Sequence, residues 1–318
     1  MYIKNLNSNG RLYLPDESTL ILVADDNSPV TVRLYKKDTN ELIVEEIFHP
    51  DNNLEISLDF KEVLEGMFQT ILPNDLDTAI EQEELEMNLW LVSVGGDLSF
   101  YFVARNTRSS YRTKMTDIDL LRVPCDYIQP TSAVGGMYGC SIELRNPFGN
   151  LVEEIPKAIP YGSAIHTIFH RISSLPGTIR SVVVDPDGKE IVKSPILHVC
   201  QGSFEQYLFA NKYGGFDNIP MDGVRTFTAH HQFKTLKSPS TGKTIPIGNN
   251  VDKEYTQHSG NLTRVCVNVL CDLLTSRQIY HLVNEEWKQI VITQCSVSHK
   301  STESLHSITF SYKYCKQS

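Results

Sequence analysis

The sequence predicts a mainly β protein built from two consecutive β-sandwich units and a closing α+β unit. Many short stretches alternate between apolar and polar residues, which is the period of a half-buried strand. The 318 residues include 14 tyrosines and 13 phenylalanines, and aromatic residues favour strands. Two stretches about 100 residues apart also resemble one another, which suggests that one unit occurs twice.

The first unit contains two predicted hairpins with a crossing segment between them. In residues 29–47, Val30, Val32 and Leu34 fall on one face and polar residues on the other, before a polar turn and a returning strand. Residues 54–68 begin as a strand and continue with apolar residues at helical spacing, so we expect a short helix there. Residues 87–105 form the second hairpin, around a Gly-Gly-Asp turn.

The second unit repeats this plan. Residues 139–156 read as strand, polar turn, then Leu-hydrophobic-Glu-Glu-Ile, which matches residues 29–47 by eye. Residues 180–195 form a further hairpin around an Asp-Pro-Asp-Gly turn. A period of about 100 residues with several short strands in each unit is typical of tandem immunoglobulin-like sandwiches. The predicted domains are residues 1–110, 111–203 and 204–318.

The closing unit mixes helix and strand. Val267, Leu270, Cys271 and Leu274 follow helical spacing, and two strands should come after this helix. Residues 305–314 alternate between aromatic or aliphatic and polar side chains, which predicts a final strand. Residues 238–250 are rich in Ser, Pro and Gly and are predicted to form a polar loop that contacts a neighbouring subunit.

Composition excludes several classes of partner. The net charge is −9 and no cluster of Lys and Arg is present, so no nucleic-acid partner is expected. No apolar run approaches the ~18 residues of a membrane span, and the first residues do not form a signal peptide. The seven cysteines are odd in number and irregularly spaced, so we expect free, mostly buried thiols made in a reducing cytoplasm.

No motif predicts catalysis or a cofactor. The sequence lacks a nucleophile elbow, a P-loop and a dinucleotide fingerprint. His166 and His170 are four residues apart, as on one face of a helix, but no carboxylate or cysteine cluster accompanies them. The adjacent His230 and His231 would point to opposite faces of a strand. We therefore predict no catalytic, cofactor-binding or metal-ligating residue.

A double-glycine turn is the one local feature that calls for an explanation. Gly214 and Gly215 allow positive φ and close backbone approach, and Asp217 is expected to bond its own backbone as an Asx-turn. Tyr213 and Phe216 would then pack the second sandwich against the closing unit. These five residues are the candidates for a structural hinge.

Three ordered segments, residues 207–219, 255–264 and 273–314, carry a resemblance to a known group. Together they resemble structural, tail-associated virion proteins of Bacteroidetes tailed phages, including crAss-like phages. The resemblance covers residues 204–318, and the first 200 residues are similar in architecture alone. It implies a non-enzymatic virion component of the baseplate, tail tip or neck collar. Such a protein would assemble in the host cytoplasm with copies of itself and neighbouring virion proteins.

Two other functions stay open at this stage. A carbohydrate- or host-surface-binding adaptor would bind a surface glycan on an exposed aromatic platform, and Trp287 with Tyr280 are the candidates. A glycan-degrading enzyme would use carboxylates that no motif reveals, because the separation of two acids in space is invisible in sequence.

Overall fold

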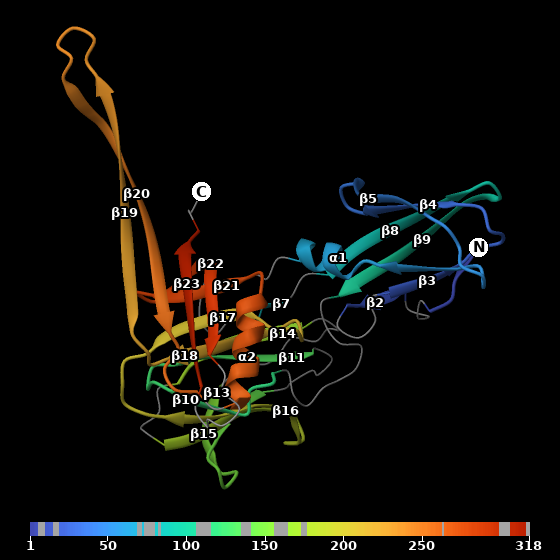
Figure 1. Cartoon of the computed structure of the whole chain (residues 1–318). Helices are drawn as coiled ribbons and strands as arrows, with labels where there is room; N and C mark the ends of the chain where they lie inside the picture. The colour runs from blue at the N-terminus through green and yellow to red at the C-terminus, as the bar shows by residue number, and fades with distance from the viewer. Residues whose placement is uncertain are drawn as a thin grey trace.

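The computed structural model describes residues 1–5, 10–14, 19–68, 72, 80–81, 84–105, 116–134, 141–155, 165–172, 177–262, 264–298 and 306–315. Strands dominate these residues, and two helices lie among them (Figure 1). The predicted fold class, mainly β with a closing α+β unit, is confirmed. The domain boundaries remain a prediction.

The first sandwich pairs a three-stranded sheet with a five-stranded sheet. The order of the smaller sheet is β1 (Tyr2–Ile3), β3 (Thr19–Val23), β6 (Glu55–Asp59). The order of the larger sheet is β2 (Arg11–Tyr13), β9 (Gly96–Arg105), β8 (Glu84–Ser93), β4 (Val30–Lys36), β5 (Glu41–Phe48). Helix α1 (Lys61–Met67) follows β6 and buries Leu64. Alternate residues of the strands, such as Leu22 and Leu34, fill one core between the sheets.

The second sandwich repeats the larger sheet strand for strand. Its order is β10 (Leu120–Val123), β16 (Glu190–Val199), β15 (Gly177–Val184), β12 (Ser141–Arg145), β13 (Leu151–Ile155). In both sheets the first strand pairs in parallel with the last, and the hairpin at the other edge carries an irregularity near its turn. This shared order matches an immunoglobulin-like arrangement, so the predicted repeat is present in the topology.

The smaller sheet of the second sandwich contains a strand from the first third of the chain. Its order is β11 (Ile128–Val134), β14 (Ile165–Arg171), β7 (Ile80–Glu81). β7 precedes the last two strands of the first sandwich in the sequence, yet it pairs with β14. The backbone therefore connects the two sandwiches through more than one crossing.

The closing unit is a seven-stranded sheet with one helix. The order is β18 (Phe216–Met221), β17 (Glu205–Ala210), β21 (Ile279–Val283), β22 (Glu286–Ser298), β23 (Ser307–Tyr314), β20 (Thr244–His258), β19 (Arg225–Lys237). Helix α2 (Arg264–Thr275) occupies the position that the helical spacing predicts. No helix in the described part of the chain is long and apolar enough to span a membrane.

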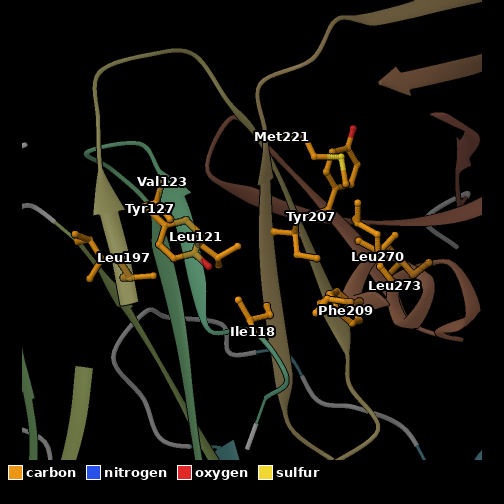
Figure 2. Close-up of a cluster of buried hydrophobic side chains, with 14 of the residues drawn as sticks. Ile118, Leu121, Val123, Tyr127, Leu197, Tyr207, Phe209, Met221, Leu270 and Leu273 are labelled. Atoms are coloured by element: carbon orange, nitrogen blue, oxygen red, sulfur yellow. The ribbon is translucent and has the colours of Figure 1, made fainter. Parts of the chain in front are cut away.

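Both faces of this sheet are covered near β17. On one face, Tyr207 and Phe209 share a core with Leu270 and Leu273 of α2, and Figure 2 shows these side chains beside those of the second sandwich. On the other face, Leu208 lies in a cluster with Phe169 of β14. The second sandwich and the closing unit therefore share continuous apolar cores.

Two predicted elements are wrong. Residues 238–250 are not a loop, because only the turn at 238–243 separates β19 from β20. Residues 165–171, which include His166 and His170, form β14 instead of a helical segment. Their β-branched residues favour a strand, and β11 supplies the antiparallel partner. Four residues along a strand span roughly 13 Å, so the helical spacing of the two histidines does not bring them together.

Candidate interaction site

The double-glycine segment forms a tight turn between β17 and β18. Gly214 has a φ of +83°, a backbone conformation that a residue without a Cβ adopts at no steric cost. Asn211 accepts backbone hydrogen bonds on Oδ1 from Tyr213 (3.0 Å) and Gly215 (3.1 Å). The Asx-turn residue is therefore Asn211, and the prediction that assigned this role to Asp217 is wrong.

Asp217 instead lies inside β18 and is buried. Burial raises the pKa of its carboxyl group to about 7, with hydrogen bonds from Thr116 and Asn211 opposing the shift. Asp217 precedes the buried Asn218 in a strand whose residues are all buried. The carboxyl group belongs to the junction between the second sandwich and the closing unit.

Aromatic residues of the turn contact the second sandwich. The ring of Phe216 packs on Phe169 of β14, with centroids 5.4 Å apart, and its backbone N–H donates to Oγ of Ser132 at 3.3 Å. The hydroxyl of Tyr213 donates to Asp117. These contacts place Tyr213, Gly214, Gly215, Phe216 and Asp217 in one interdomain junction, where they hold two packed units together.

The largest exposed feature lies elsewhere, in β19 and β20. These strands pair over 13 positions, from Arg225–Gln257 to Lys237–Thr244, while β20 meets its other neighbour, β23, only between Tyr255 and His258. Figure 1 shows them extending as an orange two-stranded ribbon beyond the rest of the sheet. We call residues 225–258 the arm and residues 231–251 the distal arm.

The arm has one apolar face over residues 227–233 of β19. Strand alternation places Phe227, His231 and Phe233 on this face, and Phe227 and Phe233 are 65% and 67% exposed. Opposite them on β20, Tyr255 packs on Phe227 with centroids 6.0 Å apart, and Val251 pairs with His231. Tyr255 also packs on Tyr312 and Tyr314 of β23, whereas Phe227 and Phe233 remain largely exposed.

The other face of the same stretch of the arm is polar. Thr228, His230 and Gln232 lie there on β19, and Glu254 and Asp252 lie opposite the first two on β20. His230 and His231 thus point to opposite faces, as adjacent strand residues do. A ribbon with one polar and one apolar face is suited to binding along the apolar side.

The distal arm is basic. It contains Lys234, Lys237 and Lys243 and no Asp or Glu. All three lysines are exposed, and none has an ion-pair partner among the described residues. The whole chain carries a net charge of −9, so the rest of the molecule carries −12 once these three charges are set aside.

A polar network around the buried His281 lies at the base of the arm. Glu205 Oε2 lies 2.7 Å from Nε2 of His281 and 3.0 Å from Nη1 of Arg225, the first residue of β19. The hydroxyl of Tyr314 lies 2.7 Å from Nδ1 of the same imidazole. The ring of Tyr207 stacks on it with centroids 4.6 Å apart and 9° between the planes.

The protonation of this network follows from its burial. His281 is fully buried, and desolvation lowers the pKa of its imidazole despite the nearby carboxylate. The hydrogen bond from His281, with the positive charge of Arg225, holds the pKa of Glu205 below its ordinary value. A neutral His281 that donates from Nε2 and accepts from Tyr314 on Nδ1 satisfies both contacts. These contacts link the first residue of β19 to β17, β21 and β23, whereas the strands of the distal arm pair with each other.

The described residues contain no group of three or more His, Cys, Asp or Glu that could hold a metal ion. His170 is buried and its Nε2 lies 3.2 Å from Oγ of Ser181. Cys125, Cys200, Cys271, Cys295 and Cys315 are free thiols. None of these five is fully buried, and Cys271 and Cys295 are exposed, so the prediction of mostly buried thiols is wrong for them. Cys140 lies outside the described residues.

Sequence reasoning missed the arm as a strand pair. The signal was present, because Phe227, Ala229, His231 and Phe233 alternate with polar residues. It also missed the network at the base, whose members come from four separate segments of the chain. No local pattern links Glu205, Arg225, His281 and Tyr314, so only the folded sheet reveals them.

Comparisons with known proteins add little beyond fold. No family model matches the chain, and no curated protein matches it. Among solved structures, the titin domains I67–I69 share 10% identity at a TM-score of 0.22, covering 76% of this chain and 86% of that one. A complex of Dpr2 Ig1–Ig2 with DIP-Theta Ig1–Ig3 shares 9% identity at 0.22, covering 99% and 90%.

A Bacteroides ovatus protein, SGBP-B of a mixed-linkage glucan utilization locus, was solved with a mixed-linkage heptasaccharide. It shares 12% identity with this chain at a TM-score of 0.20, covering 94% of this chain and 73% of that one. Scores this low support no argument about function, and the assignment must come from the chain's own surfaces.

Proposed function

We propose that this chain is a non-enzymatic structural component of a phage virion, tail-associated, which assembles by docking its arm on a neighbouring protein. The single observation that supports assembly is the arm: a long ribbon with an apolar face, open edges and a base held by hydrogen bonds to the rest of the sheet. A two-stranded hairpin is marginally stable in water by itself. Exposed edges of this length are either protected or used for pairing, and on the distal arm no other strand or helix of the described residues covers them.

The virion setting rests on the resemblance of residues 204–318 to tail-associated phage proteins. Tandem sandwiches followed by a sheet with a projecting ribbon suit a part that must contact several neighbours at once. Baseplate, tail tip and neck collar all require such contacts, between identical copies or between different proteins.

An arm-shortened variant tests the assembly role. Replacing residues 230–252 with Asn-Gly joins Ala229 to Lys253, a directly paired position, through a two-residue turn that suits a hairpin. We expect unchanged thermal unfolding of the body, with loss of incorporation into particles or of association in solution. Normal incorporation of this variant would contradict the proposal.

The virion setting has its own test. Mass spectrometry of purified phage particles should detect the chain as a stoichiometric component, and negative-stain images should place it at the tail. Detection in the host cell envelope alone, with none in particles, would rule out a virion protein.

A glycan-binding adaptor is a second candidate, favoured by a different pair of aromatics. Tyr280 is buried and Trp287 packs against the cluster around Phe216, so the predicted platform of these two residues is wrong. Trp90 and Tyr101 are instead 46% and 44% exposed on the outer face of the first sandwich.

These two aromatics lie diagonally across neighbouring strands. Tyr101 is directly opposite Asn88, two residues from Trp90 on the same face of β8. Lys37 Nζ lies 4.1 Å from the centroid of the Tyr101 ring. Soluble glycans should then quench tryptophan fluorescence of the chain and fail to quench Trp90→Ala, with Trp287 still present as an internal reference. Equal quenching of both proteins would exclude this platform.

A further inference from the structure

The distal arm is basic and apolar, so its acceptor should be an acidic, apolar surface with a free strand edge. The pairing of β20 with β23 ends at Tyr255. From there to the tip, β19 and β20 pair with each other alone among the described residues, so the outer edge of each strand carries backbone groups without a partner strand. Addition of a strand to an exposed sheet edge is a common mode of protein recognition, in which backbone hydrogen bonds supply affinity and side chains supply specificity.

The edge strand β13 of the second sandwich has these properties. Among the described residues it pairs with β12 on one side and with no strand on its other edge. Leu151 and Val152 are exposed apolar residues on β13, and Phe148, in the turn that precedes it, is 89% exposed. We call residues 148–154 the β13 edge.

The charge of the β13 edge is complementary to that of the distal arm. Glu153 and Glu154 are adjacent and exposed, and neither forms an ion pair within the described part of the chain. Glu153 lies opposite Leu144, whose side chain is in the core, so this glutamate sits on the inward face of an edge strand. Inward-pointing charges block non-specific edge pairing, and they leave the edge open to a partner that brings positive charge.

A groove adjoins this edge. A cavity of about 290 Å³ lies on the outer face of the same sheet, lined in part by Arg145, Pro147 and Ile196. The hairpin turn from Asn146 to Gly149 forms one wall of it, next to Phe148. Because Arg180 and Lys193 also line this cavity, it suits apolar side chains of the arm and not its lysines.

The equivalent edge of the first sandwich is less suited to the arm. On β5, Glu45 already forms an ion pair with Arg33 at 3.2 Å. Both glutamates of the β13 edge are without an ion-pair partner among the described residues, whereas one of the two adjacent glutamates of β5 already has one, so we take β13 as the acceptor.

The two surfaces cannot meet within one chain. In Figure 1 the arm extends away from the body on the side opposite β13. A contact between different surfaces of identical chains is heterologous, and it generates a ring if the rotation closes and a filament if it does not.

We propose that the distal arm of one copy binds along the β13 edge of a second copy, extending its five-stranded sheet. In this pairing Lys234, Lys237 and Lys243 face Glu153 and Glu154. The inference rests on the proposed assembly function and adds to it the identity of the partner and of the acceptor strand.

Sedimentation velocity of the full-length chain provides the test. The unaltered protein should form species larger than the 36.0 kDa chain, in a concentration-dependent way that high salt weakens. Charge reversal by Glu153→Lys with Glu154→Lys should weaken association at least about tenfold. The matched reversal on β5, Glu45→Lys with Glu46→Lys, should leave it unchanged.

Mixing two defective variants makes the test directional. The arm-shortened variant keeps an intact β13 edge, and the Glu153→Lys, Glu154→Lys variant keeps an intact arm. Each alone should be monomeric, whereas their mixture should give a 1:1 heterodimer that grows no further. Circular dichroism checks that both variants are folded.

The outcomes separate the two proposals. If the arm-shortened variant fails to assemble while the β13 reversal assembles normally, the arm role holds and β13 is not the acceptor. If the arm-shortened variant assembles like the unaltered chain, the proposed function itself fails. An unaltered protein that stays monomeric at every concentration would overturn the choice of a second copy as the partner.

Discussion

The Cα atom of Gly215 lies so close to Ser132 that no side chain fits between them. A Cβ atom on Gly215 would come within 2.7 Å of the Cβ of Ser132 and closer still to its Oγ. Ser132 belongs to β11 of the second sandwich, and its hydroxyl also bonds Thr167 at 2.9 Å. The absence of a side chain on Gly215 therefore allows the β17–β18 turn to pack directly against β11 of the second sandwich.

Replacing Gly215 with alanine should destabilise the protein. The added methyl group must displace a buried hydroxyl or shift the β17–β18 turn, and overpacking of this kind costs about 1–3 kcal/mol of unfolding free energy. Urea unfolding measures it. Gly95→Ala is the matched control, since a Cβ there meets nothing closer than Ser93 Oγ at 3.8 Å. Equal stability of Gly215→Ala and the unaltered chain would refute the close approach.

Asp217 should make the folded protein more stable as the pH falls. Its folded pKa is about 7 against an ordinary 3.8, because burial disfavours the charged form. Between these two values the folded state holds a proton that the unfolded state has lost. Stability attributable to Asp217 is therefore present at low pH and lost as the pH rises through about 7.

The variant Asp217→Asn removes this dependence. Above pH 7 the variant should be more stable than the unaltered chain by on the order of a few kcal/mol, and the difference should vanish near pH 4. Thermal unfolding across pH 4–8.5 measures it, with Asp126→Asn, an exposed aspartate, as the control. A constant difference at every pH would show that the carboxyl group titrates normally.

His281 should act in the opposite direction. Desolvation holds the pKa of its imidazole below 6.5, so the unfolded state takes up a proton first on acidification. The stability it contributes is complete above about pH 6.5 and declines below it. His281→Gln loses the contacts to Glu205 and Tyr314. We expect this loss to lower the free energy of unfolding by about 1–3 kcal/mol at pH 7.5.

The gap between His281→Gln and the unaltered chain should narrow as the pH falls toward 5. Both proteins are best compared in the Asp217→Asn background, because Asp217 shifts stability in the other direction over the same range. A gap that widens on acidification would mean that the imidazole is charged in the folded state.

Local periodicity was enough to predict most regular elements. Alternation at Val30, Val32 and Leu34 predicted β4, and these three side chains are buried. Helical spacing from Val267 to Leu274 predicted α2. The likeness between residues 29–47 and 139–156 predicted hairpins that occupy equivalent edges of two sheets. In each case one face of an element meets a core, which is what binary patterning records.

Features without a core escaped prediction. Residues 244–250 form half of an exposed ribbon, so no apolar stripe distinguishes them from a loop, and their Gly, Pro and Asn content favours a turn. The buried carboxyl group of Asp217 accepts hydrogen bonds from Thr116, far away in the sequence, and from Asn211, close to it. Such features depend on which distant segments the topology places together, and the local hydrophobic periodicity of a sequence carries no information about those contacts.

The apolar face of the arm should be required for assembly and dispensable for folding. Phe227 and Phe233 are largely exposed, so changing both to serine removes little buried surface from the folded chain. The expected result is an unchanged melting temperature with association weakened by about tenfold or more, as buried aromatic anchors dominate interfaces. Changes on the polar face, Thr228→Ala with Gln232→Ala, serve as the control and should have a small effect. If the polar-face variant loses association and the aromatic variant keeps it, the arm binds its partner through its polar face, and the proposed role of the apolar face is wrong.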